Sequence, residues 1–169
     1  MNQQLTVHFA SNEFEEGGDA IPADCMNIFA VLCAVILEPI RIYVARPITI
    51  TSGYRSAQDN KLAHGVSDSE HVATPKSCAA DFTFGNVYGS LISVRSAFDW
   101  IRRSPTLPFH QVILEHGANG SSIIHVSINL TKPGIRQALE GATHNSSPYI
   151  AWEVVPYVPI NTTGGQENA

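Results

Sequence analysis

The sequence predicts a single α+β domain in which helices pack on a mainly antiparallel sheet. Its 169 residues suit one domain, and 44% of them are hydrophobic, which is enough for one core. Helical and strand patterns occur in the mixed order helix, strands, helix, strands. The last two strands are separated only by the Gly-rich stretch 117–120, which is typical of an antiparallel hairpin. We assign residues 1–157 to the domain and 158–169 to a flexible polar tail.

The first predicted element is a long apolar helix that begins after Asp24, a residue type that can cap a helix. Apolar side chains recur at helical spacing along it, at Ile28, Val31, Leu32, Val35 and Ile36. Because Pro39 cannot donate an amide hydrogen bond, we expect a kink or a break there. The strongest apolar run, 25–37, is too short to span a bilayer, so we expect no membrane insertion.

The middle of the chain alternates between strand and helix patterns. The predicted elements are a strand over 48–51, a helix over 56–63, a strand over 79–84 and a helix over 89–103. Gly53 turns the chain between the first strand and the first of these helices. The second helix must end before Pro105.

The hairpin strands, predicted over 111–116 and 122–130, decide which polar side chains share a face. If the apolar rows of both strands cover one core, Glu115 and His125 must both lie on the opposite face. Cross-strand neighbours lie about 5–8 Å apart, a spacing that suits a metal ligand beside a general base. His116 is a poorer candidate for a site residue, because the alternation of the strand places it with the apolar residues that face the core.

His71, Asp81 and His125 are candidate metal ligands. Asp81 stands beside small residues, which suggests a face kept clear, and His71 lies in a loop of small and polar residues. Two imidazoles and one carboxylate suit tetrahedral zinc with the fourth position open to water. Taken alone, each residue also fits an ordinary structural role, such as a strand histidine facing solvent.

Charge, cysteine spacing and the N-terminal sequence argue against several other kinds of protein. The net charge of -5, without a Lys/Arg cluster, argues against a nucleic-acid partner. Cys25, Cys33 and Cys78 are an odd number without Cys-x-x-Cys spacing, so we expect buried thiols rather than disulfides or a thiolate zinc site. The N-terminal residues lack the pattern of a secretory signal, which predicts synthesis in the cytoplasm.

Four segments support grouping the candidate ligands. They are Thr-Ser-Gly-Tyr-Arg-Ser at 51–56, Ser-Glu-His at 69–71, Ala-Ala-Asp-Phe at 79–82 and Ile-His-Val-Ser at 124–127. In this order they resemble the motifs of the zinc D-Ala-D-Ala carboxypeptidase family, especially its small phage-type branch. The resemblance covers about residues 7–129 and implies a Hedgehog/DD-peptidase-like fold.

The resemblance also implies site residues. By match, His71, Asp81 and His125 would bind Zn²⁺. The planar guanidinium of Arg55 would hold a substrate carboxylate through two hydrogen bonds, and Ser69 would be a second substrate contact.

The chain departs from the family pattern in two places. The stretch 71–81 is three residues longer than the usual His-x-x-Gly-x-Ala-x-Asp and has no glycine, so we expect a bulged loop that still lets the ligands converge. Larger members carry the catalytic acid three residues before the last histidine, where this chain has Ser122. Glu115 is the best replacement, because the phage-type branch resembles this arrangement, with Ile-x-Glu ending the preceding strand.

The implied function is a zinc metallopeptidase that cuts peptidoglycan stem peptides or cross-links, as a carboxypeptidase or an endopeptidase. Glu115 would take a proton from the attacking water and return it to the leaving amine. A phage-encoded lysis or entry enzyme acting at the cell wall fits this reading, and a monomer is expected. Two alternatives stay open: an inactive peptidoglycan-binding or virion-structural module of the same fold, and a zinc-free interaction domain.

Overall fold

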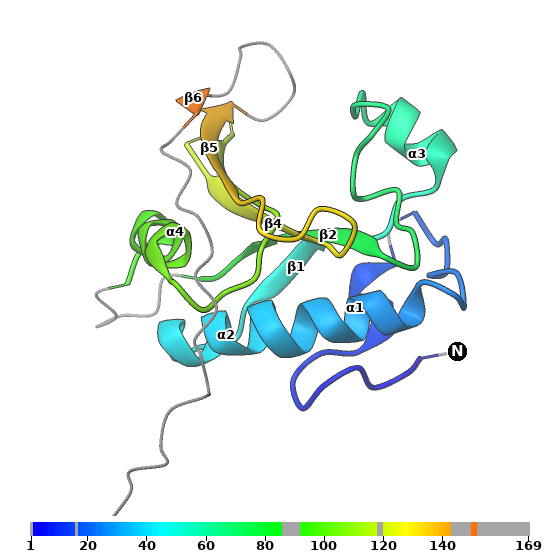
Figure 1. Ribbon diagram of the computed structural model, residues 1–169, viewed down its shortest axis with the longest axis horizontal. Helices are drawn as coiled ribbons and strands as arrows, with labels where there is room; N and C mark the ends of the chain where they lie inside the picture. Colours follow the sequence, from blue (N-terminus) through cyan, green and yellow to red (C-terminus); the bar gives the residue numbers. More distant parts are fainter. Residues whose placement is uncertain (1, 16, 86–91, 118–119, 143–149, 152–169) are drawn as a thin grey trace, which may run out of the picture.

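The computed structural model describes residues 2–15, 17–85, 92–117, 120–142 and 150–151, which form helices and one mixed sheet (Figure 1). The strands are β1 (Thr49–Ser52), β2 (Ser77–Thr83), β3 (Gln111–His116), β4 (Ser122–Asn129), β5 (Gln137–Ala142) and β6 (Ile150–Ala151). They lie in the order β1-β2-β4-β3-β5-β6. All neighbouring pairs are antiparallel except β3 and β5, which are parallel. The predicted α+β class with a mainly antiparallel sheet is therefore confirmed.

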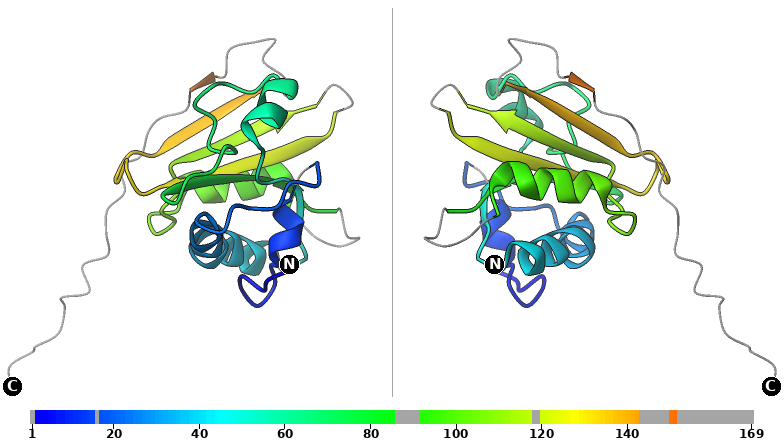
Figure 2. Two further views of the ribbon diagram at one scale, coloured as in Figure 1. Left: turned by 90° about the vertical axis from the view of Figure 1, so that its right-hand side faces the viewer. Right: turned by 90° about the vertical axis from the view of Figure 1, so that its left-hand side faces the viewer.

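The helices divide between the two faces of the sheet. They are η1 (Ser11–Phe14), α1 (Met26–Leu32), the π-helical turn η2 (Cys33–Leu37), α2 (Glu38–Val44), α3 (Ala57–Leu62) and α4 (Val94–Arg103). Figure 2 shows α1 and α2 on one side of the sheet and α3 on the other. Buried side chains of α1, α2 and α4 join those of the strands in one hydrophobic core. The opposite face of the sheet, on the side of α3, carries polar residues.

One helix runs continuously through α1, η2 and α2. The residue before it is Cys25, which makes no side-chain capping bond, so the predicted cap at Asp24 is wrong. The predicted irregularity at Pro39 is present as a widened turn instead of a break. The amide of Glu38 donates to the carbonyl oxygen of Cys33, five residues back, directly before the proline, which has no amide hydrogen to donate.

This helix is longer than the apolar run 25–37. It spans 19 residues, Met26–Val44, with a mean hydropathy of 1.8, and by length and composition alone could cross a membrane. The helix exceeds the run 25–37 because it continues through Pro39, and the absence of membrane insertion stays a prediction. Core helices of soluble proteins have the same length and composition. Here the helix packs in the core through Ile28, Phe29, Leu32, Cys33, Ile36, Leu37, Ile40 and Val44.

Most other elements occur where they were predicted. The short helix α3 begins at Ser56, whose side chain accepts a hydrogen bond from the amide of Asp59. The long helix α4 starts later than predicted, because Ser93 caps it by accepting from the amide of Ser96 at 3.0 Å. Residues 89–91 of the predicted helix and the predicted tail 158–169 lie outside the described residues, so the division into domain and tail stays a prediction.

The three cysteines are buried and unpaired, as predicted. Cys25 and Cys33 lie at the central helix, and Cys78 lies on β2. Burial raises the pKa values of Cys33 and Cys78 well above the usual value of a thiol, so both stay neutral. They act as small apolar residues of the core.

The segment before the central helix packs against the end of β1. The amide of Tyr54 donates to the carbonyl oxygen of Phe14 at 2.7 Å. The approach is so close that a Cβ atom at Gly53 would lie 2.4 Å from this oxygen and 2.5 Å from the Cα of Phe14. Only glycine therefore fits at this crossing without moving the backbone.

We predict that Gly53→Ala destabilises the fold by about 1–3 kcal/mol, the usual cost of forcing an atom into packed structure. Thermal unfolding measures it. Gly85→Ala is the matched control, because a Cβ atom there meets nothing within 4 Å. Equal melting temperatures for Gly53→Ala and wild type would show that the crossing is looser than described.

Candidate metal centre

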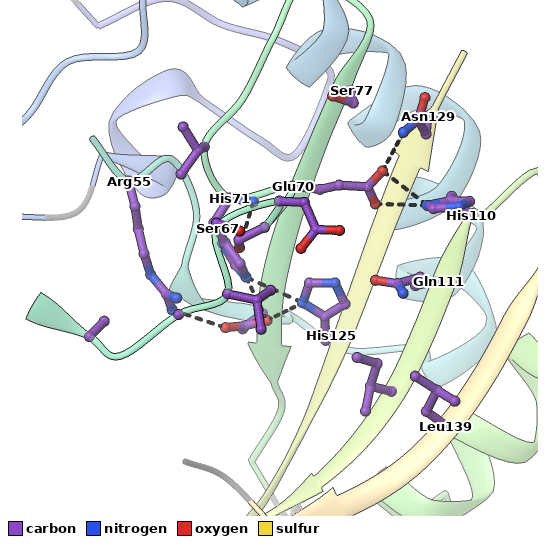
Figure 3. Close-up of a pocket in the computed structure, with 18 of the residues that line it drawn as sticks. Arg55, Ser67, Glu70, His71, Ser77, His110, Gln111, His125, Asn129 and Leu139 are labelled. Carbon is purple, nitrogen blue, oxygen red and sulfur yellow. Dashed lines mark hydrogen bonds and ion pairs between the residues drawn. The ribbon is translucent and has the colours of Figure 1, made fainter. Parts of the chain in front are cut away.

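The polar face of the sheet carries a cavity of about 650 Å³ below α3. All six residues singled out from the sequence line it: Arg55, Ser69, His71, Asp81, Glu115 and His125. Asp81 on β2 lies directly opposite His125 on β4, and His71 reaches them from the loop after α3. In Figure 3 the rings of His71 and His125 lie close together, with Arg55 on one side.

Three ligand atoms meet at one point. The Nε2 atom of His71 lies 3.2 Å from the Oδ1 atom of Asp81 and 3.2 Å from the Nδ1 atom of His125. The same Nδ1 atom lies 2.8 Å from Oδ1 of Asp81. Metal bonds of about 2.0–2.1 Å in tetrahedral geometry require ligand atoms about 3.4 Å apart. The three atoms therefore approximate three corners of a tetrahedral site, with the fourth side toward the cavity.

Backbone contacts fix the tautomer and position of His71. Its Nδ1 atom donates to the carbonyl oxygen of Gly53 at 2.6 Å, which leaves the lone pair of Nε2 facing the other ligands. The carbonyl oxygen of His71 accepts from the amide of Arg55 at 3.0 Å. A bulge in β1, between Ile50 and Ser52, sets Ser52 opposite Asp81 and brings Gly53 to this position.

Asp81 is buried yet stays ionised. Burial alone would raise its pKa, but the two histidines outweigh this effect and hold the pKa well below its usual range. Its other oxygen, Oδ2, lies 3.4 Å from Nη2 of Arg55, which also donates to the Oγ atom of Ser52 at 2.6 Å. One oxygen therefore faces the imidazoles and the other faces the guanidinium.

The lengthened stretch 71–81 closes as a tight turn. Thr74 and Ser77 exchange backbone hydrogen bonds of 2.9 and 3.2 Å around Pro75 and Lys76. After this turn β2 begins at Ser77, in a register that still delivers Asp81 to the site. The expected bulge is thus present, and the ligands converge in spite of it.

Glu115 lies on the predicted face. It pairs with Ile123, two residues before His125, so it is a diagonal neighbour of His125 across β3 and β4. Burial raises its pKa, and the nearby charge of Asp81 raises it further, so Glu115 can exchange a proton nearer neutral pH than an exposed glutamate. His116 points away, as predicted, and contacts Ser122 and Glu140 outside the cavity.

Sequence reasoning missed a second polar group in the cavity, made by Glu70, His110 and Asn129 (Figure 3). The carboxylate of Glu70 contacts Asn129 and His110. Burial alone would raise the pKa of Glu70. Its hydrogen bonds, of which the one from His110 has the largest effect, hold this pKa below the usual value of a glutamate. Asn129 lies four residues after His125 on β4, so the alternation of the strand puts both on one face, whereas nothing in the sequence marked His110.

Among protein families, the model of Peptidase M15 matches residues 6–104 of the chain, which is more than half of it. This range contains Arg55, Ser69, His71 and Asp81 but ends before Glu115 and His125. The pairing of β2 with β4 brings the last histidine to the matched ligands. No curated protein matches the chain.

We predict that Zn²⁺ stabilises the folded protein, because it binds atoms that converge only after folding. At a free ion concentration a hundredfold above Kd, the gain is about 2.7 kcal/mol, seen as a higher melting temperature that a chelator reverses. His71→Ala and His125→Ala should abolish the shift. His116→Ala should retain it, since His116 lies outside the cavity. A full shift in His125→Ala would remove His125 from the site.

Proposed function

The chain belongs to the Peptidase M15 family, and from this premise we propose that it is a zinc metallopeptidase that hydrolyses peptide bonds of bacterial peptidoglycan. The observation that carries the proposal is the meeting of His71, Asp81 and His125 in an open cavity. A cluster with a purely structural role does not need to be open to the cavity. A catalytic metal site needs such an opening, through which water and substrate reach the metal.

The donor set favours zinc. Two imidazole nitrogens and one carboxylate oxygen are the ligands of many catalytic zinc sites. A thiolate ligand is not within reach, since Cys78 lies on β2 with parity opposite to Asp81 and is buried in the core. A zinc ion bound here would supply a Lewis acid and lower the pKa of a water molecule toward about 7.

Glu115 is the proposed catalytic residue. It would accept a proton from the attacking water and pass it to the leaving amine, a role that suits a buried carboxyl group with a raised pKa. Its position diagonal to His125 puts it on the ligands' face of the sheet. No other carboxylate of β3 or β4 lies on that face.

Arg55 and Ser69 are the proposed substrate-binding residues. Arg55 lies beside the ligands, with Nη2 bound to Ser52 and Asp81, and its guanidinium has five N–H donors in all. It would hold a carboxylate of the stem peptide and so determine which peptide bond meets the metal. Ser69 lines the same cavity, two residues before His71.

The proposed substrate is a stem peptide or cross-link that contains D-amino acids, cut as a carboxypeptidase or an endopeptidase. The proposed place of action is the cell wall, in a phage-encoded lysis or entry enzyme. Mass analysis of the fragments released from purified sacculi shows whether the protein is active and which peptide bond it cuts. We expect new peptide termini with the metal-loaded protein and none with a chelator. Zinc binding without any release would instead indicate an inactive wall-binding module.

We predict that Glu115→Gln keeps zinc and loses hydrolysis, by about 10²–10⁴-fold, the usual contribution of a general acid or base. The amide preserves the shape of the side chain but cannot accept the proton. Fragment release and zinc content measure the two properties in the same sample. Glu140→Gln, on the neighbouring strand β5 and outside the cavity, should keep both. An active Glu115→Gln protein would exclude Glu115 from the chemistry.

A further inference from the structure

Glu70, His110 and Asn129 form a polar cluster in the same cavity as the metal ligands (Figure 3). The Glu70 side chain is 9% exposed. Its Oε1 atom accepts a hydrogen bond from Nδ2 of Asn129 at 2.6 Å and lies 2.9 Å from Nδ1 of His110. The same Nδ1 atom lies 3.0 Å from Oε2. The carboxylate is therefore bound by two segments that are distant from it in the sequence.

Both partners of Glu70 are themselves held in place. Asn129 is the last residue of β4, and its Oδ1 atom accepts hydrogen bonds from the amide and the hydroxyl of Thr131 at 2.9 and 2.6 Å. This orients its NH₂ group toward Glu70. His110 precedes β3, and its amide donates to the carbonyl oxygen of Ser127 at 2.8 Å. The two donors are thus fixed to the ends of β3 and β4.

His71 is the one ligand of the three that strand pairing does not hold in position. Asp81 and His125 lie on paired strands, whereas His71 lies in the connection between α3 and β2. Its hydrogen bonds to Gly53 and Arg55 hold it from the side of β1. Glu70, the residue directly before it, holds the same loop from the side of β4, the strand that carries His125.

We propose that Glu70 is a positioning residue that fastens the loop of His71 to β3 and β4. Its contacts with Asn129 and His110 would keep Nε2 of His71 at bonding distance from the metal shared with Asp81 and His125. This inference rests on the proposed function, because it takes these three residues as the metal ligands. Groups that orient metal ligands commonly contribute about 10–100-fold to metal affinity.

The test is the zinc affinity of folded protein, measured by competition with a coloured chelator. Glu70→Gln removes the charge and one acceptor, and Asn129→Ser shortens the donor while leaving the charge of Glu70 in place. We expect both to raise the Kd for zinc by about 10–100-fold. The visible spectrum of the cobalt-loaded protein should change in both, because displacement of His71 alters the coordination geometry.

Glu140→Gln is the matched control. Glu140 also pairs with a histidine, His116, at 2.8 Å, and with Arg95 at 2.7 Å, but outside the cavity. It should bind zinc like wild type and leave the cobalt spectrum unchanged. A loss of stability from a broken carboxylate–histidine pair would also appear in the melting temperature of this variant, although its pair is more exposed than that of Glu70.

The outcomes separate three explanations. Wild-type affinity and spectrum in both variants would overturn the positioning role while leaving the metal centre intact. Weak binding in Glu70→Gln alone, with Asn129→Ser unchanged, would also overturn it, since the charge of Glu70 would then act by itself. A wild-type protein that binds no zinc would refute the metal centre and this inference with it. If Glu70→Gln does not fold, Asn129→Ser decides the question.

Discussion

The metal centre depends on the register between β2 and β4. This pairing sets Asp81 opposite His125, although 44 residues separate them in the sequence. The same register buries the apolar residues of these strands, such as Phe82 and Ile124, in the core on the other face. A slip of one residue would turn apolar side chains to the cavity and ligands to the core. Burial of the core therefore maintains the geometry of the site.

That geometry requires a charged carboxylate to be buried. Asp81 is 6% exposed, a position that is tolerable only because Arg55, His71 and His125 surround it. Removing one partner of a buried ion pair commonly costs about 3–5 kcal/mol, because the remaining charge is uncompensated. The surrounding contacts thus form one unit: the end of β1 orients His71 and Arg55, and Glu70 ties the loop of His71 to β4. A bound cation would complete the compensation.

Strand parity explains why so much of the site followed from the sequence. Alternation alone placed Glu115 and His125 on one face, and a family resemblance supplied His71 and Arg55. Tertiary contacts determined the rest. The π-helical turn before Pro39, the late start of α4 at Ser93 and the tight turn at 74–77 depend on hydrogen bonds that no periodic pattern marks. The strand β5 was missed because Ala, Leu and Glu favour helices, and its pairing with β3 overrides that preference.

X-ray absorption at the zinc edge, on protein loaded with one equivalent of zinc, tests the ligand set most directly. Two imidazole nitrogens and carboxylate or water oxygens should appear at about 2.0–2.2 Å, without sulfur. His71→Ala and His125→Ala should lose the zinc, and any ion that stays bound in them should show fewer imidazole ligands. A sulfur shell at about 2.3 Å, or an unchanged spectrum in these variants, would contradict a centre built from His71, Asp81 and His125.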